Sequence, residues 1–335
     1  MEQKKINHKS EILFLYETTY NIPNGDPFTG EQRYDEETKK ILVSDVRMKR
    51  YVRDYLASHG KEIYVIGDKT HAEGSESGSA SRLKSLQTKT FKSELEKEIN
   101  HFKEIEKEAK DKDETANAKA AISSFSNALF VMKKCVDVRL FGGISTAKGD
   151  AVNLTGPIQF GLLNPSLNQV NLRMHQNTSV FSSSAEKSQG AIGTTTLVPY
   201  SLVQIHGWLN PKVAELTGMT ESDLDNLFEA LWYGTSGEGS SHSRSKIGQN
   251  SVLLLEVIYS GRNDKVYGLD RLIQFVPKAG KKGEEVRSMD DYELNFTKLL
   301  EVANSNKVKQ VNFFTEIASI EDKLNTNNKF KKIEL

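Results

Sequence analysis

Short apolar runs along the chain predict a set of β-strands. The clearest are residues 11–19 (EILFLYETT) and 251–260 (SVLLLEVIYS), which are apolar and bounded by polar residues. Residues 168–176 alternate strictly between apolar and polar positions, as expected for a strand with one buried face. The Pro- and Gly-rich residues 21–30 predict a loop after the first strand. Similar apolar runs predict further strands at 62–67, 154–162, 196–209, 271–276 and 309–317.

Apolar positions at helical spacing predict amphipathic helices at 45–58, 91–110, 117–136, 220–233 and near 290–303. The helix at 91–110 has a narrow apolar stripe between charges of both signs, which is typical of a surface helix docked by one seam. Thr220 and Asp223 form a capping box at the start of the fourth helix. The core stripe of that helix is Leu224, Leu227, Phe228 and Leu231.

The helix at 45–58 carries the most distinctive charge pattern. Ser44 is suited to cap its N-terminus, and Asp45 is favourable at the positive end of the helix dipole. Its apolar stripe is Met48, Tyr51, Val52, Tyr55 and Leu56. The opposite side carries Arg47, Lys49, Arg50 and Arg53. This basic face fits either a solvated surface or a phosphate-binding surface, and the helix alone does not decide between them.

The order of the predicted elements indicates the fold class. Without its insertions, the chain runs through strand 11–19, helix 45–58, strand 154–162, strand 196–208, helix 220–233 and strand 251–260. This βαββαβ order is that of a ferredoxin-like or RRM-like sheet, which is an α+β fold. A long polar stretch, 182–193, lies between two predicted strands and suggests a protruding hairpin. Because such folds host many functions, the fold class does not identify the activity.

Composition narrows the class of protein. Lys plus Arg and Asp plus Glu each number 45, so the net charge is near zero and nucleic-acid binding must come from local clusters. The single cysteine, Cys135, excludes a disulfide framework and a cysteine-based zinc site, and it fits a reducing compartment. The first residues contain no apolar core of signal-peptide length, and no stretch of about 18 apolar residues occurs in the sequence. We therefore expect a soluble, cytoplasmic protein.

The common catalytic motifs are absent from the sequence, which has neither a G-x-S-x-G elbow nor a P-loop. Cys135 falls in a predicted helix, where packing is its more frequent role. The seven histidines show no i, i+4 spacing, so no metal site is predicted. Asp26, Glu31 and residues 35–37 form an acidic cluster, which is more often a charged loop than a metal nuclease. We expect no enzyme activity and no cofactor.

Three basic islands favour RNA binding: the basic face of the first helix, Arg139 in DVRLFGG, and Arg244 with Lys246 in the Ser/Gly-rich segment 235–250. In a βαββαβ fold, the first helix and the loops at the sheet ends can line one groove, where Arg and Lys neutralise phosphates. Gly142 and Gly143 fit either a close approach to RNA or a plain turn after a helix. Since no RNP-like aromatic motif is present, we expect binding along the RNA backbone.

Several short motifs follow one another in an order that resembles a known family. They are NGD (24–26), VSDVRMKRYVRDYL (43–56), DVRLFGG (137–143), GPIQFG (156–161), VPYSL (198–202) and LWYGTSG with SRSKIGQ (231–249). The ordered set resembles the Cascade backbone subunits of type I CRISPR systems, which form the Cas7 family of the RAMP superfamily, in its Csh/Csd branch. The resemblance covers residues 10–260 well and the C-terminal part more loosely.

The resemblance implies an RRM-like palm of residues 1–67 and 131–335, a helical finger insertion at 68–130 and a β-hairpin thumb at 165–196. It implies a non-catalytic, I-B-like subunit. Several copies would stack head to tail along one CRISPR RNA and present guide segments for pairing with target DNA. The other implied partners are a small RAMP end-cap subunit, a large subunit and a processing endonuclease subunit, with no membrane involved.

The RNA-binding residues implied by the resemblance come from the basic islands and the motifs around them. They are Asn24, Ser44, Arg47, Lys49, Arg50, Arg53, Arg139, Gly142, Gly143, Gln159, Met174, Arg244, Ser245 and Lys246. Met174 fits either a wedge at a displaced base or a packing residue of the hairpin. The chain departs from the branch after Asp26, where relatives carry an Arg-containing Asn-x-Pro-Arg-like run and this chain has Arg33 alone. Contacts from that loop to RNA are therefore not expected.

Two alternatives belong to other functional classes. The first is a type III-like backbone subunit, in which Asp26 would cut bound target RNA with a metal ion. The second is a structural protein that assembles without RNA. The basic helix face disfavours this second alternative, because protein interfaces are depleted in lysine.

Overall fold

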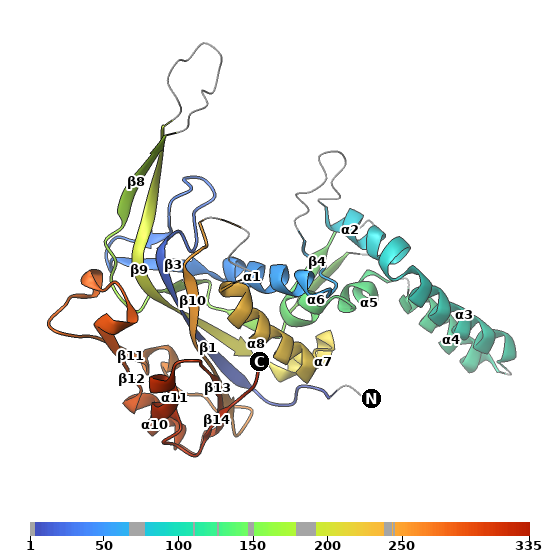
Figure 1. Ribbon diagram of the computed structural model, residues 1–335. Helices are drawn as coiled ribbons and strands as arrows, with labels where there is room; N and C mark the ends of the chain where they lie inside the picture. Colours follow the sequence, from blue (N-terminus) through green and yellow to red (C-terminus); the bar gives the residue numbers. More distant parts are fainter. Residues whose placement is uncertain are drawn as a thin grey trace, which may run out of the picture. The chain divides into compact units, whose positions relative to one another are not determined.

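The computed structural model describes residues 4–66, 78–109, 111–125, 127–146, 151–178, 192–237, 243 and 245–335. The chain is a mixed α/β protein that divides into two compact units (Figure 1). The first unit comprises Met1–Asn7, Leu56–Ile158 and Asn210–Asn226. The second comprises His8–Tyr55, Gln159–Leu209 and Leu227–Leu335. Each unit is therefore built from segments that are far apart in the sequence.

The second unit is organised around a mixed sheet. Among the described residues its strand order is β14-β13-β10-β1-β9-β6, and β8 pairs with β9. Only the β13–β14 pair is parallel among the pairs whose register is defined in this sheet. The strands are β1 (Ser10–Asn21), β6 (Ile158–Phe160), β8 (Arg173–Thr178), β9 (Ile192–Leu209), β10 (Gln249–Tyr259), β13 (Val308–Phe314) and β14 (Phe330–Lys332). Because β1 lies inside the sheet, residues 12 to 16 are fully buried, which explains its continuous apolar run.

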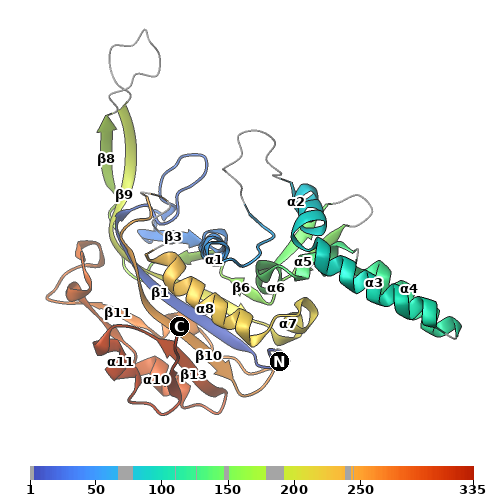
Figure 2. The ribbon, with the colours of Figure 1, turned by 45° about the vertical axis from the view of Figure 1, so that its right-hand side comes forward.

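Two helices cover one face of this sheet (Figure 2). They are α1 (Asp45–Ser58) and the part of α8 (Glu221–Thr235) from Leu227 onward. The predicted stripe of α1 is confirmed, since Met48 and Tyr51 are completely buried. A Cβ atom on Gly234 of α8 would stand 3.0 Å from the Tyr51 carbonyl oxygen, so glycine permits the close packing of the two helices.

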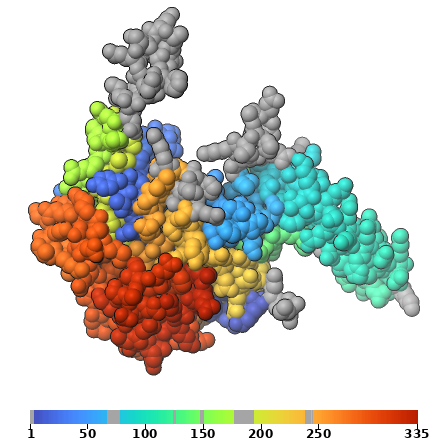
Figure 3. All heavy atoms as spheres, viewed as in Figure 1, coloured from blue at the N-terminus to red at the C-terminus, as the bar shows by residue number. Residues whose placement is uncertain are grey.

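The C-terminal segments cover the other face and form a contiguous mass in the space-filling view (Figure 3). Leu13 and Leu15 of β1 share one core cluster with Phe296, Leu299 and Leu324. The elements here are β11 (Gln274–Pro277), β12 (Tyr292–Asn295), α10 (Thr297–Ala303) and α11 (Ala318–Leu324), with 3-10 turns at Leu269–Arg271, Gly283–Glu285 and Met289–Asp291. A small sheet, β2 (Tyr34–Asp35), β3 (Lys40–Ser44) and β7 (Leu163–Pro165), completes the unit.

The first unit is mainly helical. Its helices are α2 (Ser79–Ser85), a π-helical turn (Leu86–Thr90), α3 (Lys92–Glu108), α4 (Lys112–Phe125), α5 (Ala128–Lys133), α6 (Val136–Phe141) and α7 (Pro211–Thr217), and β4 (Gly142–Ser145) pairs with β5 (Val152–Thr155). The predicted capping box is confirmed, because the Thr220 N–H donates to the Asp223 carboxylate at 3.0 Å and the Asp223 N–H donates to Thr220 Oγ1 at 3.3 Å. Cys135 is buried in the hydrophobic core of the first unit, and this burial raises the pKa of its thiol. Both observations fit the packing role expected from the sequence.

The strand predicted at 62–67 is wrong, since residues 62–66, the described part of this range, form no strand. The backbone N–H groups of Tyr64 and Val65 donate to the buried carboxylate of Asp137, at 2.7 and 3.0 Å. The Asp137 side chain thus accepts the backbone hydrogen bonds that a neighbouring strand would otherwise accept.

The single helix predicted at 117–136 is also wrong, because α4 ends at Phe125 and α5 begins at Ala128. Asn127 caps α5 by accepting the Leu129 N–H at 2.8 Å, and asparagine is a frequent residue at such a start. The segment DVRLF of the motif DVRLFGG forms most of helix α6 (Val136–Phe141).

Several predicted strands are shorter than expected, including 271–276, which is a strand only from Gln274, and 309–317, which ends as a strand at Phe314. The run 154–162 is divided into β5 and β6 by Gly156, whose α-carbon lies so close to the backbone of Phe141 that a Cβ atom would stand 2.1 Å from it. The run 168–176 is a strand only from Arg173, because Asn168 uses its side chain to accept the Leu202 N–H at 2.9 Å. Near 290–303, β12 precedes the helix, which begins at Thr297.

Candidate nucleic-acid interface

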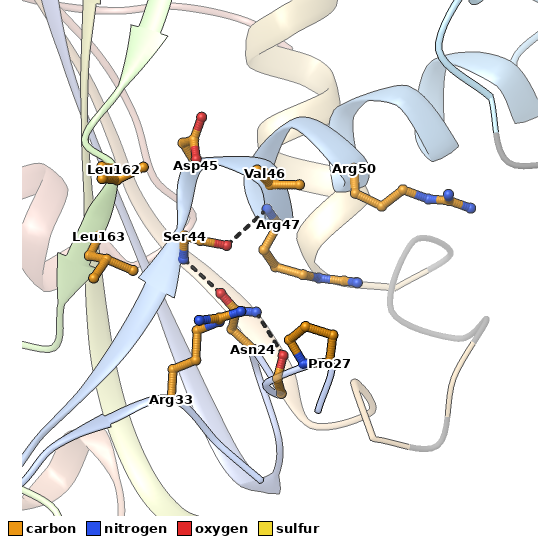
Figure 4. A pocket seen from close by; sticks show the side chains of 11 residues that line it. Asn24, Pro27, Arg33, Ser44, Asp45, Val46, Arg47, Arg50, Leu162 and Leu163 are labelled. Carbon is orange, nitrogen blue, oxygen red and sulfur yellow. Dashed lines mark hydrogen bonds between the residues drawn. The ribbon is translucent and has the colours of Figure 1, made fainter. Parts of the chain in front are cut away.

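An open groove of about 610 Å³ lies at the N-terminal end of α1, within the second unit. Its wall has three parts: the loop after β1, the first turns of α1, and the residues at β7 (Figure 4). The lining residues are Asn24, Gly25, Pro27, Arg33, Ser44, Asp45, Val46, Arg47, Arg50, Leu162 and Leu163. Arginines therefore form one part of the wall, and the exposed aliphatic side chains of Val46, Leu162 and Leu163 form another.

The loop is fixed to the start of α1 by the buried Asn24. Its side-chain oxygen accepts the Ser44 N–H at 2.7 Å, and its backbone N–H donates to Gln32 at 2.9 Å. Its carbonyl oxygen accepts the Arg33 N–H at 3.0 Å. Because Asn24 bonds to both sides of the groove, the arginines of the loop and of the helix are held in a defined relation.

The predicted N-cap hydrogen bond of α1 is present, but it is long. The Arg47 N–H donates to Ser44 Oγ at 3.4 Å, which is near the limit of a hydrogen bond (Figure 4). Asp45 forms an ion pair with Lys49 at 3.0 Å. Asp45, which also lines the groove, therefore has a cationic partner on its own helix.

Arg47 is held in position by an aromatic ring. Its guanidinium carbon lies 3.9 Å from the centroid of Tyr51, and the Tyr51 hydroxyl bonds to Gln249 at 3.0 Å. Its buried Nε atom has no hydrogen-bond partner. Arg50, one turn further on, pairs with Asp54 at 2.7 Å and has a side chain that is 42 % exposed. Such an exposed pair is weak, so Arg50 can exchange Asp54 for another anion.

A second hollow of about 450 Å³ shares Gly25 with the groove and is lined by Ser245 and Lys246. Lys246 is buried, and its ammonium group donates to the Ile22 carbonyl oxygen and to Ser245 Oγ. Burial, and to a smaller extent the positive charge of Arg47, lower the pKa of Lys246 to about 8. A negative charge near Arg47 and Lys246 would relieve this repulsion. The remaining lining residues are Tyr20, Asn21, Ile22, Gly30, His175, Thr195 and Leu197.

The structure thus brings together six of the predicted RNA-binding residues. Asn24, Ser44, Arg47 and Arg50 line the groove, and Ser245 and Lys246 line the second hollow. Lys49 and Arg53 lie on the same helix but line neither cavity. Gln159 and Met174 are exposed, on β6 and β8. Arg244 lies outside the described residues.

The other predicted residues have contacts within the first unit. Arg139 forms a bidentate pair with Asp223, at 2.9 and 2.7 Å, and also donates to two backbone carbonyl groups. Gly142 has φ +77, and a Cβ atom there would stand 2.0 Å from the Leu154 carbonyl oxygen. A Cβ atom on Gly143 would stand 3.0 Å from Met132. The close approach at these glycines is therefore made by the protein's own chain.

Sequence reasoning missed Arg33 as a residue of the groove. It stands in the polar run after Asp26, which has no periodicity that marks a binding position. Its backbone bonds to Asn24 and to Leu42 hold it in the wall of the groove, which Arg47 also lines (Figure 4). The sequence offers no signal for this position, because the burial of Gln32 and the backbone bonds that order the loop appear only in the folded structure.

The carboxylate of Asp26 is used within the same loop. It accepts the Phe28 N–H at 2.9 Å and pairs with Arg33 at 3.2 Å. The Phe28 hydrogen bond lowers the pKa of Asp26 against a smaller desolvation effect, and Thr29 and Arg33 lower it further. In the part of the chain that the structure describes, no three His, Cys, Asp or Glu side chains are grouped to hold a metal ion.

In fold, the chain is a mixed α/β protein similar to subunits of CRISPR surveillance complexes. It matches a chain of a "CRISPR RNA-guided surveillance complex, pre-nicking" with a TM-score of 0.52 and 12 % identity, covering 98 % of this chain and 96 % of that one. It is 28 % identical to the CRISPR-associated protein Cas7 of Haloferax volcanii over 314 residues, which is 88 % of this chain and 82 % of the relative. The family model "CRISPR-associated protein Cas7" matches residues 8–297, so the chain belongs to the Cas7 family. The family predicted from the sequence motifs is confirmed.

No helix in the described ranges is both long and apolar enough to cross a membrane.

Proposed function

We propose that this chain is a backbone subunit of a type I, I-B-like CRISPR surveillance complex and binds CRISPR RNA along the groove at α1. The observation that carries the proposal is that Arg47 and Arg50 of α1 line one open groove. Guanidinium groups bind phosphate oxygens in pairs of hydrogen bonds, and arginine stays charged throughout the physiological range. Membership of the Cas7 family and the fold similarity to a surveillance-complex subunit support the same function.

The palm, finger and thumb remain part of this proposal. The chain order β1, α1, β6, β9, α8, β10 and the sheet order β10-β1-β9-β6 are those of a ferredoxin-like unit, which supports an RRM-like palm. The helical hairpin of α3 and α4 lies in the proposed finger, 68–130. The ribbon of β8 and β9 lies in the proposed thumb, 165–196, where the exposed Met174 is available to displace a base.

In the proposed complex, copies of the chain stack head to tail on one guide RNA in the cytoplasm and expose guide segments to target DNA. The end-cap, large and processing subunits are the other partners. The subunit is non-catalytic in this proposal, because the Asp26 carboxylate is engaged by the Phe28 and Thr29 N–H groups of its own loop.

The test is a binding titration with a labelled guide-like RNA of about 60 nucleotides over a range of salt concentrations. For single strands the logarithm of the binding constant falls with a slope of about −0.7 per phosphate contact, so Arg47→Gln/Arg50→Gln should flatten the slope by about 1.4. Arg262→Gln/Arg271→Gln, which changes two exposed arginines outside the groove lining, is the matched control. Equal slopes for both double variants would exclude the groove as the RNA site. Mg²⁺-dependent cutting that Asp26→Asn abolishes would instead establish a nuclease.

A further inference from the structure

Arg33 lines the groove, and its ion-pair partner Asp26 would compete with any phosphate for the guanidinium group. One of its terminal nitrogens lies 3.2 Å from the Asp26 carboxylate, and the two side chains are 32 % and 28 % exposed. Its Nε atom is buried and has no hydrogen-bond partner. The guanidinium group is therefore incompletely bonded, although it lines an open cavity.

The backbone around Arg33 is rigidly held. Its N–H donates to the Asn24 carbonyl oxygen at 3.0 Å, and its own carbonyl oxygen accepts the Leu42 N–H at 2.8 Å. The guanidinium group can consequently change partners by side-chain rotation alone, without moving the loop. Arg47 stands on the same groove and has the same unbonded Nε atom, so two guanidinium groups with unused donors line one cavity.

Asp26 is held independently of Arg33. Its carboxylate accepts the Phe28 and Thr29 N–H groups at 2.9 and 3.4 Å, and its backbone closes the turn through Glu31 and Gly30. The carboxylate thus stays in place when Arg33 leaves it. A fixed anion at this point weakens the attraction between Arg33 and any other anion in the groove.

We propose that Arg33 is a further phosphate ligand of the groove and that Asp26 is its built-in competitor, which holds Arg33 until RNA displaces it. This inference rests on the proposed function, because it requires RNA in the groove. A partly exposed ion pair contributes little net stability, so exchanging the carboxylate for a phosphodiester is feasible at modest cost. The phosphodiester can also accept two parallel hydrogen bonds, which include the unused Nε donor.

The test is a double-mutant cycle measured by RNA binding at low and moderate salt. Asp26→Asn frees Arg33 and should tighten binding about threefold to tenfold, whereas Arg33→Gln should weaken it by a similar factor and flatten the salt slope by about 0.7. In Asp26→Asn/Arg33→Gln the gain from Asp26→Asn should be lost. The matched controls are Asp270→Asn and Arg271→Gln, an exposed pair at 3.9 Å outside the groove lining, which should change binding little.

The outcomes separate this inference from the proposed function. If wild type binds RNA through Arg47 but Asp26→Asn leaves binding unchanged or weakens it, the competition is refuted and the proposed function stands. If Asp26→Asn tightens binding equally with and without Arg33, a general charge effect replaces the specific one. If wild type does not bind RNA, both fail. Asp26→Ser, which keeps an acceptor for the turn, repeats the measurement should Asp26→Asn fold poorly.

Discussion

At the scale of single residues, Lys246 shows how burial near another cation changes a side chain's chemistry. Its ammonium group is surrounded by oxygen atoms of Ile22 and Ser245, and its pKa is lowered to about 8 from an ordinary value of 10.5. Between these two pH values the unfolded chain binds more protons at this position than the folded protein does. Stability contributed by this residue therefore rises with pH across that window and is constant below it.

The prediction for Lys246 is a pH-dependent difference in stability. The free energy of unfolding of wild type, relative to Lys246→Met, should rise by roughly 1–3 kcal/mol from pH 8 to pH 10.5. Urea unfolding curves at several pH values measure it, with the exposed Lys298→Met as control. A difference that stays constant over this range would mean that the Lys246 pKa is not lowered.

Gly142 and Gly60 illustrate two different reasons why a position favours glycine. Both have positive φ, +77 and +75, but a Cβ atom would meet the Leu154 carbonyl oxygen at Gly142 and open space at Gly60. Gly60→Ala should therefore cost about 1 kcal/mol, from the backbone conformation alone. Gly142→Ala should cost about 3 kcal/mol or more, because the backbone of β5 must also move. Chemical unfolding of the two variants compares them directly, and equal costs would contradict the close approach.

At the scale of elements, the Arg139–Asp223 pair joins α6 to the beginning of α8 inside the first unit. Asp223 is nearly buried and also caps its own helix, so removal of Arg139 leaves a carboxylate without its strongest partner. This arrangement indicates that Arg139 stabilises the fold of the first unit.

We accordingly expect Arg139→Gln to lower the free energy of unfolding by about 2–4 kcal/mol while leaving the salt dependence of RNA binding unchanged. Arg47→Gln is the counterpart and should show the reverse: a small effect on stability and a flatter salt slope. Unfolding curves and binding titrations of both variants decide the matter. A flatter slope for Arg139→Gln would instead place Arg139 on the RNA.

At the scale of the whole molecule, the proposed binding along an RNA backbone would impose a linear arrangement on copies that share one strand. Head-to-tail contacts between different surfaces build open arrays, so the number of copies should follow the length of the RNA. Guide-like RNAs of about 30 and 60 nucleotides should carry copy numbers in a ratio of about two. Mass photometry of the complexes counts them, with Arg47→Gln/Arg50→Gln as the binding-deficient control. One fixed copy number on both RNAs would be inconsistent with an array.

The amino-acid sequence alone was sufficient to predict the elements whose pattern is local. The periodicity of residues 45–58 predicted α1 with its correct bounds, and the buried stripe and opposite basic face followed from the same spacing. The apolar run 11–19 likewise predicted the strand that is β1 in the structure. The ordered motifs were sufficient to predict the family, because several short runs had to occur in one order. Each of these inferences depends on residues that are neighbours along the chain.

The tertiary structure decided which side chains meet. Arg33 became a groove residue through backbone bonds to Asn24 and Leu42. Lys246 became buried with its ammonium group bonded to Ile22 and Ser245. Residues 64 and 65 form no strand, because their N–H groups bond to Asp137. These outcomes depend on hydrogen bonds and charges between residues that are distant in sequence. A linear pattern records which residues are apolar or charged, but only folding sets the distances on which electrostatic and hydrogen-bond energies depend.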